Sequence, residues 1–168
     1  MLAIAAMCKE KDWEFIYYSK PVSKIIKEQS FGNLYQAKEF GMIHLEIEHE
    51  NYRDFIAQLR VNLDYKTFLI DQGGADPLAK IGVDVLAKEI RDSALEIKSI
   101  ATPSGTGTTA LFLALALPEY KVYTVACGGD TEYLKKQMQV RSEIPENLII
   151  LNPNKKYHFA KLYPEFLS

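Results

Sequence analysis

The residues best suited to chemistry form one short run of glycines and hydroxyl side chains. The run lies between an apolar stretch at 97–101 and a very apolar segment at 110–117, and it comprises Ser104, Gly105, Thr106, Gly107, Thr108 and Thr109. Glycines let the backbone approach an anion closely, and the first N–H groups of a following helix face that anion. The helix dipole favours a dianionic group at the same end. We therefore predict that this loop binds a phosphate group.

The kind of phosphate site is narrowed by the pattern around the loop. No lysine follows the last glycine, as it does in a Walker loop, and the glycines do not follow the dinucleotide pattern with its distal acid. A phosphate that stays bound fits this composition better than one that is transferred. The alternative is an ordinary strand-to-helix turn in which Ser104 or Thr108 caps the helix.

Two glycine pairs follow other predicted strands and are candidates for the same site. Gly73 and Gly74 come after the apolar run 68–71, and the pair Gly128-Gly129 comes after the run 122–127. In an open parallel sheet, ligands bind beyond the carboxyl ends of the strands, so three such turns would line one crevice. This convergence favours a flat cofactor lying across the sheet edge, although each pair alone fits a simple turn.

Hydrophobic periodicity predicts a regular alternation of helices and strands. The predicted helices span 1–11, 21–29, 33–39, 51–63, 77–93, 107–117, 130–139 and 156–167, and the predicted strands span 13–18, 43–47, 66–70, 97–101, 121–126 and 147–151. Alternation of this kind is typical of right-handed crossovers and a parallel sheet, so the predicted fold class is α/β. The runs 68–70 and 122–126 lack in-out alternation, which favours central strands.

A change of character near residues 49–66 divides the chain, because shorter and more charged elements precede it. We place small-lobe elements at 1–60 and the phosphate-binding part of a large lobe at 61–168. Both ends resemble cut elements, since the first helix has no capping residue and the apolar segment 162–167 stops where it would begin to pack. The alternative is that both termini dock on the core.

Composition excludes several classes of protein. The 168 residues carry a formal charge of -2 with scattered Lys and Arg, so a nucleic-acid partner is not expected. No apolar run reaches the roughly 20 residues that a membrane span needs, so no membrane partner is expected. Cys8 and Cys127 are far apart, and the three histidines have no metal-ligand spacing, so we predict no metal site. A reducing cytoplasm is the simplest setting.

The same motifs resemble a known enzyme family. The segment 72–77, with Gly82 and 87–90, and the segment 101–109 are similar to the 1-aminocyclopropane-1-carboxylate deaminase and D-cysteine desulfhydrase family. The segment 31–34 is similar to a Gly-Asn-Leu segment of that family. The resemblance implies a three-layer, parallel-sheet core of the fold-type-II kind found in pyridoxal-phosphate enzymes. It also implies that residues 104–109 bind the phosphate of pyridoxal phosphate.

The sequence departs from the family pattern in ways that bear on catalysis. The family carries a Gly-Asn-Lys segment whose lysine bonds covalently to the cofactor, and then a Ser-x-x-Ser-Asn segment, and neither is found here. The pair Asn154-Lys155 follows the last predicted strand, and Ala5 and Ala6 cannot replace a serine, so we predict no catalytic residue in this chain. The core is expected to be incomplete at both ends.

Two functional hypotheses follow. The first is a partial pyridoxal-phosphate enzyme whose complete parent releases ammonia from a small amino acid by deamination or β-elimination, while this chain is inactive and binds the cofactor weakly or not at all. The second is a non-catalytic α/β module that binds a phosphorylated small molecule or a partner chain. Incomplete sheets expose edges and apolar faces, so a homo-oligomer is expected in either case.

Overall fold

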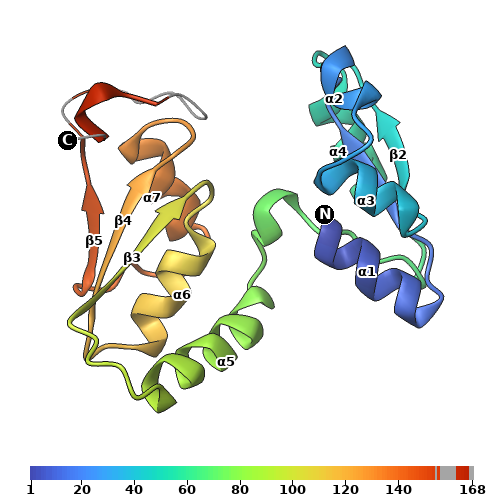
Figure 1. Ribbon diagram of the computed structural model, residues 1–168. Helices are drawn as coiled ribbons and strands as arrows, with labels where there is room; N and C mark the ends of the chain where they lie inside the picture. The colour runs from blue at the N-terminus through green and yellow to red at the C-terminus, as the bar shows by residue number, and fades with distance from the viewer. Residues whose placement is uncertain (154, 156–161, 167–168) are drawn as a thin grey trace. The chain divides into compact units, whose positions relative to one another are not determined.

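The computed structural model describes residues 1–153, 155 and 162–166. The chain divides into two compact units, Met1–Leu69 and Ile70–Ser168, which we call unit 1 and unit 2 (Figure 1). Each unit has a parallel β-sheet and its own helices. The two units are described separately below.

Unit 1 is a small α/β unit built on two parallel strands. Its elements are α1 (Leu2–Lys11), β1 (Ile16–Ser19), α2 (Lys24–Glu28), α3 (Asn33–Glu39), β2 (Ile43–Glu46) and α4 (Tyr52–Val61). The strands pair in register from Ile16 opposite Ile43 to Ser19 opposite Glu46. A small core forms around Ala5, Ala37 and Met42 where α1 packs on α3.

Unit 2 is an α/β unit with a three-stranded sheet. Its elements are η1 (Gln72–Gly74), α5 (Ala79–Asp92), β3 (Ser99–Ser104), α6 (Thr108–Ala116), β4 (Lys121–Ala126), α7 (Thr131–Gln139), β5 (Leu148–Leu151) and η2 (Pro164–Phe166). The strand order is β3-β4-β5 and both pairings are parallel. The prediction that 121–126 forms a central strand is therefore confirmed. Pro103 lies in β3, which is an outer strand here and pairs with β4 only. Outer strands tolerate proline because they do not need backbone hydrogen bonds on both sides.

The connections of unit 2 place its helices on one face of the sheet. Strands that follow one another in order, joined by right-handed crossovers, put α6 and α7 on the same side (Figure 1). The side chains on that face, among them Val122, Thr124 and Leu148, are buried against the helices. Helix α6 is apolar all round and is covered by α5 on its outer side, which is how a fully buried helix reads in sequence. It ends at Ala116, two residues before Pro118, a residue that cannot continue a helix.

The other face of this sheet is also apolar. Ala101, Pro103, Tyr123, Val125 and Leu151 point to it and line a shallow hollow of about 240 Å³. Parallel sheets are normally covered by helices on both faces. Among the described residues of unit 2, helices cover one face only, so unit 2 by itself has two layers of the expected three-layer core.

One predicted strand does not form. Residues 66–70 have no ladder partner among the described residues, and Phe68 and Ile70 are exposed. The start of this segment belongs to a local turn, in which the carboxylate of Asp64 accepts hydrogen bonds from the backbone N–H of Lys66 and the hydroxyl of Thr67. Residues 67–70 continue without regular structure. The prediction of a central strand at this position is therefore wrong. Most of the helix predicted at 156–167 lies outside the described residues, and 164–166 form a short 3₁₀ turn.

No helix in the described part of the chain has the length and apolar character that crossing a membrane would need.

Candidate phosphate-binding site

The glycine and hydroxyl loop connects β3 to α6 in only three residues. Strand β3 runs through Ser104, beyond the predicted end at Ala101, and α6 begins at Thr108. Gly105, Thr106 and Gly107 therefore make the whole connection. A turn this short holds the first N–H groups of α6 close to the carboxyl end of β3, the edge of a parallel sheet at which ligands bind.

The N-terminus of α6 has no side-chain cap. Gly107 occupies the capping position with a φ of +78°, and no side chain of the described residues bonds to the first N–H groups of the helix. The alternative in which Ser104 or Thr108 caps this helix is therefore wrong. By contrast, Asp130 does cap the next helix, α7, because its carboxylate accepts a hydrogen bond of 2.7 Å from the N–H of Tyr133. The first turn of α6 keeps free donors that an anion can use.

The four hydroxyls of the loop have different surroundings. Thr106 and Thr108 lie with their Oγ1 atoms 3.0 Å apart, and Thr106 is half-buried. Ser104 is buried, and a hydrogen bond of 2.7 Å joins its Oγ to Oγ1 of Thr124 inside the sheet layer. Thr109 is exposed on the first turn of α6. The two loop hydroxyls that lie together at the N-terminus of α6 are therefore those of Thr106 and Thr108.

The turn that contains Gly73 and Gly74 meets this loop. A Cβ built on Gly73 would lie 3.0 Å from Cγ2 and 3.1 Å from Oγ1 of Thr106, whereas one on Gly74 meets nothing within 4 Å. Both glycines have positive φ, +74° and +59°. The structure therefore brings together Gly73 and Thr106, which are more than thirty positions apart in sequence and were predicted to share a site. Gly73 allows this close approach because it has no side chain.

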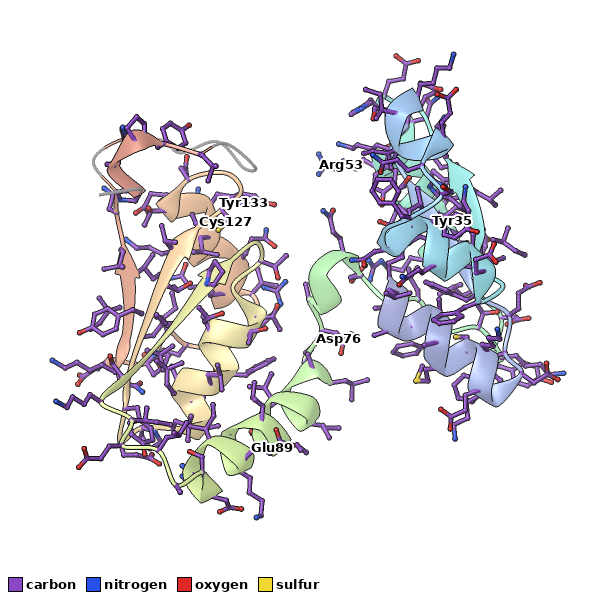
Figure 2. The ribbon with its side chains drawn as sticks, in the orientation of Figure 1. Tyr35, Arg53, Asp76, Glu89, Cys127 and Tyr133 are labelled. Atoms are coloured by element: carbon purple, nitrogen blue, oxygen red, sulfur yellow. The ribbon has the colours of Figure 1, made fainter. Side chains whose placement is uncertain are left out.

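The third glycine turn lies beside the loop through the backbone. The N–H of Cys127 donates a hydrogen bond of 2.8 Å to the carbonyl of Ser104, so the turn at Gly128-Gly129 starts next to the end of β3. Cys127 and Tyr133 both lie at this end of the sheet (Figure 2). The three turns therefore gather at one edge, as predicted, although the first follows an irregular segment rather than a strand.

Arg141 is a further residue of this region that the sequence analysis did not identify. It follows α7, and its Nη1 donates to the carbonyls of Gln137 and, at 3.5 Å, Thr106. The guanidinium therefore lies behind the loop and adds a permanent positive charge there. The local pattern around Arg141 carries no signal for this role, since the contact joins residues 35 positions apart.

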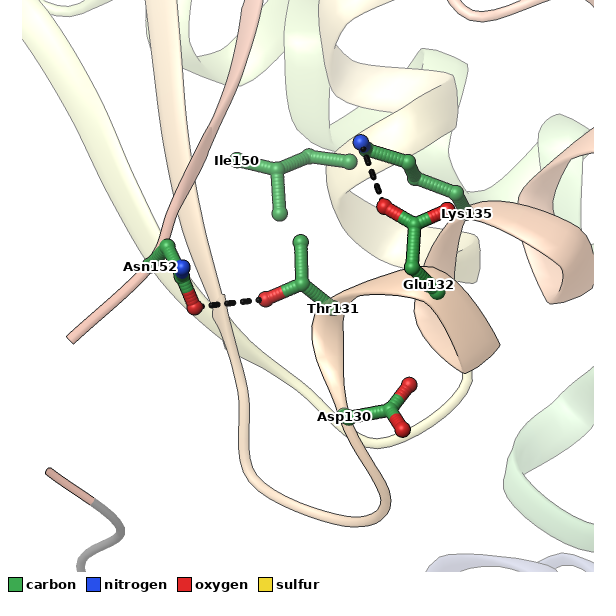
Figure 3. Close-up of a pocket in the computed structure, with 6 residues that line it drawn as sticks. All are labelled: Asp130, Thr131, Glu132, Lys135, Ile150 and Asn152. Atoms are coloured by element: carbon green, nitrogen blue, oxygen red, sulfur yellow. Dashed lines mark hydrogen bonds and ion pairs between the residues drawn. The ribbon is translucent and has the colours of Figure 1, made fainter. Parts of the chain in front are cut away.

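A separate hollow of about 450 Å³ lies between the start of α7 and the end of β5. It is lined by Asp130, Thr131, Glu132, Lys135, Ile150 and Asn152 (Figure 3). Its polar groups bond to one another, as in the contact of 3.2 Å between Thr131 and Asn152 and the ion pair between Lys135 and Glu132. None of the predicted phosphate-binding residues lines it. A phosphate held by backbone N–H groups needs no such hollow, so we place the candidate site at the loop.

Unit 1 holds a histidine network whose pattern is structural. Nε2 of His44 lies 2.8 Å from Oγ of Ser19, and that hydroxyl donates a hydrogen bond of 2.7 Å to the carbonyl of Lys20. With the proton of His44 on Nε2, the imidazole donates to the hydroxyl of Ser19 and that hydroxyl donates to the carbonyl of Lys20, so both donors have an acceptor. The ring also stacks on Tyr17, with 5.6 Å between the centroids. Among the described residues, no group of three potential ligands could hold a metal ion.

The pKa of His44 is expected to lie below its usual value. Burial lowers it most, and the charge of Lys38 lowers it further. A lowered pKa means that the folded chain binds fewer protons than the unfolded chain, so this part of the stability is present above the unfolded pKa and is lost as the pH falls. We expect the ring protons of His44 to titrate by NMR at a lower pH than in the urea-unfolded chain. The substitution Lys38→Gln should raise the pH at the midpoint of this titration. An unchanged midpoint would contradict the conclusion that the charge of Lys38 lowers the pKa of His44.

Comparison with known proteins defines the fold class. No protein-family profile and no curated protein sequence matches the chain. Solved structures do match it, and they show an α/β fold with parallel strands of the fold-type-II kind, as the sequence predicted. The likeness shows the fold alone, because the sequence identities are low.

Three enzymes are similar to this chain in structure. The crystal structure of an ACC deaminase homologue matches with a TM-score of 0.61 and 18% identity, over 89% of this chain and 51% of the other. O-ureido-L-serine synthase matches with a TM-score of 0.57 and 12% identity, over 90% and 53%. A hydrogen sulfide-producing enzyme from Fusobacterium nucleatum matches with a TM-score of 0.50 and 12% identity, over 89% and 56%. The chain thus spans about half the length of the structures it matches.

Proposed function

We propose that this chain binds the phosphate group of pyridoxal phosphate as part of an enzyme that deaminates, or eliminates from, a small amino acid. The observation that carries the proposal is the uncapped N-terminus of α6 beside the hydroxyls of Thr106 and Thr108. A dianionic phosphate at this point would accept hydrogen bonds from both hydroxyls and from the free N–H groups. Gly73 supports the fit, because only a residue without a side chain can lie this close to Thr106.

Two independent likenesses support the choice of chemistry. The sequence motifs resemble the 1-aminocyclopropane-1-carboxylate deaminase and D-cysteine desulfhydrase family. The structural neighbours include an ACC deaminase homologue and a hydrogen sulfide-producing enzyme. Neither likeness alone defines a substrate, but both indicate amino-acid chemistry in the same fold.

The residues of this chain would bind and orient the cofactor rather than react. When bound, pyridoxal phosphate supplies an electron sink for bonds at the amino-acid α carbon. The loop would hold the phosphate by Thr106, Thr108 and the backbone N–H groups of α6, which fixes one end of the cofactor. The lysine segment of the family has no counterpart in these residues. We therefore propose that the chain binds the cofactor reversibly and does not turn over substrate by itself.

The test is reversible binding followed by chemical trapping. Purified chain is titrated with pyridoxal phosphate, with inorganic phosphate as competitor, and then reduced with borohydride for peptide mass analysis. We expect saturable binding that phosphate displaces, a loss of about tenfold or more in affinity for Thr106→Val and for Thr108→Val, and no stoichiometric adduct on one lysine. Thr131→Val, at the start of α7, is the matched control and should bind like the parent chain.

The other outcomes separate the competing hypotheses. One fully modified lysine would identify a catalytic residue and overturn the proposal that the chain is inactive. Binding of phosphate and unrelated phosphorylated compounds as tightly as pyridoxal phosphate would favour a general phosphate-binding module. Absence of any phosphate-dependent binding would exclude the site.

A further inference from the structure

We propose that Arg141 is a positioning residue that orients the phosphate loop and supplies an unneutralised positive charge behind it. This inference rests on the proposed function, because its effect is on an anion bound at the loop. The residue lies beyond the end of α7 and outside the motifs quoted above for the resemblance to the enzyme family. Its backbone N–H bonds to the carbonyl of Met138 at 2.8 Å, which makes a tight turn directly after α7.

The contacts of the guanidinium join the loop to α7. Nη1 donates to the carbonyl of Gln137 and, at 3.5 Å, to the carbonyl of Thr106. In a trans peptide the carbonyl of one residue and the N–H of the next point in opposite directions. Because the Thr106 carbonyl faces Arg141, the N–H of Gly107 points away from that guanidinium. This orientation leaves that N–H available to a ligand on the other side of the loop.

The charge of Arg141 is not neutralised by any carboxylate in the described part of the chain. Its Nε is buried and has no hydrogen-bond partner among these residues, and no ion pair involves its side chain. A half-buried guanidinium without a counter-charge is costly, because the surrounding protein screens it poorly. A dianionic group at the loop would offset this cost and would be held more tightly in return.

Arg91 shows what a merely structural arginine looks like in the same unit. It lies at the other end of α6, where its Nη2 donates to the carbonyl of Ala116 at 2.5 Å. Its charge is neutralised by Glu119, with Nε 2.6 Å from the carboxylate. Arg91 and Arg141 thus both bond to backbone carbonyls near α6. Of the two, only Arg141 has no carboxylate partner among the described residues, and it lies beside the candidate site.

A simpler role for Arg141 would be to cap its own helix through Gln137 alone. That role predicts a loss of stability on substitution but no selective effect on anions. The proposed role predicts a selective effect on the phosphate group and recovery when the charge is restored by lysine. These two expectations make the roles distinguishable.

The experiment compares Arg141→Gln, Arg141→Lys and Arg91→Gln in the full chain. Affinities are measured for inorganic phosphate, pyridoxal phosphate and pyridoxal, together with the melting temperature of each variant. We expect Arg141→Gln to weaken both phosphate ligands by about tenfold while pyridoxal binding stays the same. Arg141→Lys should recover most of the loss, and Arg91→Gln should bind phosphate like the parent chain.

Each remaining outcome decides against the positioning role of Arg141 or against the proposed function together with it. If the parent chain binds phosphate and Arg141→Gln binds it equally well, the positioning role is wrong while the proposed function stands. Equal weakening in the glutamine and lysine variants, or an equal loss for pyridoxal, would reduce Arg141 to a structural tether. If the parent chain binds no phosphate, the proposed function fails and this inference fails with it. Should Arg141→Gln not fold, the ratio of phosphate to pyridoxal affinity in Arg141→Lys decides, and a parent-like pyridoxal affinity with strongly weakened phosphate binding would overturn the charge role.

Discussion

Replacing Gly107 by alanine is expected to destabilise unit 2 by about 2–4 kcal/mol. Two causes act together. Gly107 has a φ of +78°, a left-handed conformation that costs a residue with a Cβ about 1–2 kcal/mol. The added Cβ would also lie 2.6 Å from Cγ of Met138 and 3.1 Å from Cδ1 of Leu134, in contact with fully buried side chains of α7. The core must therefore shift to accept it.

The matched control for Gly107→Ala is Gly82→Ala. Gly82 lies within α5 and a Cβ there meets nothing within 4 Å. Alanine at this site should stabilise the helix by about 0.5–1 kcal/mol, so the two substitutions have opposite signs. Denaturant unfolding followed by far-UV circular dichroism, with amide exchange in β4, measures the effect on unit 2, while Trp13 fluorescence reports on unit 1. Equal stability of Gly107→Ala and the parent chain would show that neither the left-handed conformation nor the contact with Met138 carries the expected cost.

Replacing Gly73 by alanine is expected to weaken phosphate binding by about tenfold or more. The added methyl would lie 3.0 Å from Cγ2 and 3.1 Å from Oγ1 of Thr106, which is closer than side chains normally pack. Thr106 must then move, and its hydroxyl would lose its place beside that of Thr108, 3.0 Å away. A rotation of the Thr106 side chain that clears the methyl group would turn its hydroxyl out of line with the anion, and hydrogen bonds weaken steeply when the donor angle becomes poor.

Gly74→Ala separates this contact from backbone strain. Gly74 is the next residue of the same turn, has a φ of +59°, and has open space where the Cβ would be added. Its substitution carries a similar conformational cost without touching Thr106. We expect Gly74→Ala to lower the stability of the turn but to bind phosphate within a few-fold of the parent chain. Equal losses of affinity in the two variants would assign the effect to the turn and not to Thr106.

The local patterns of the sequence predicted most of the fold. The apolar, β-branched run at 121–126 became the central strand β4, and the very apolar segment after the glycine loop became the buried helix α6. Alternation of such segments was enough to predict parallel strands. Patterns of this kind succeed because they depend on how a residue fits its own element, which neighbouring residues decide.

The run at 66–70 shows where local patterns fail. Its residues favour a strand, but a strand exists only where another strand pairs with it, and none of the described residues does so. Similarly, the hydroxyls at 104–109 all appeared equivalent in sequence. The structure commits Ser104 to Thr124 inside the sheet layer and leaves Thr106 and Thr108 together at the helix N-terminus.

The sequence by itself determined the α/β class, the central strand and the location of a loop with the composition of a phosphate site. Only the tertiary structure decided that Gly73 lies against Thr106 and that Arg141 reaches the Thr106 carbonyl. The physical reason is distance along the chain. Composition and periodicity record the preferences of residues a few positions apart, whereas these contacts join residues 30 or more positions apart, and they exist only after the strands have paired and the helices have packed.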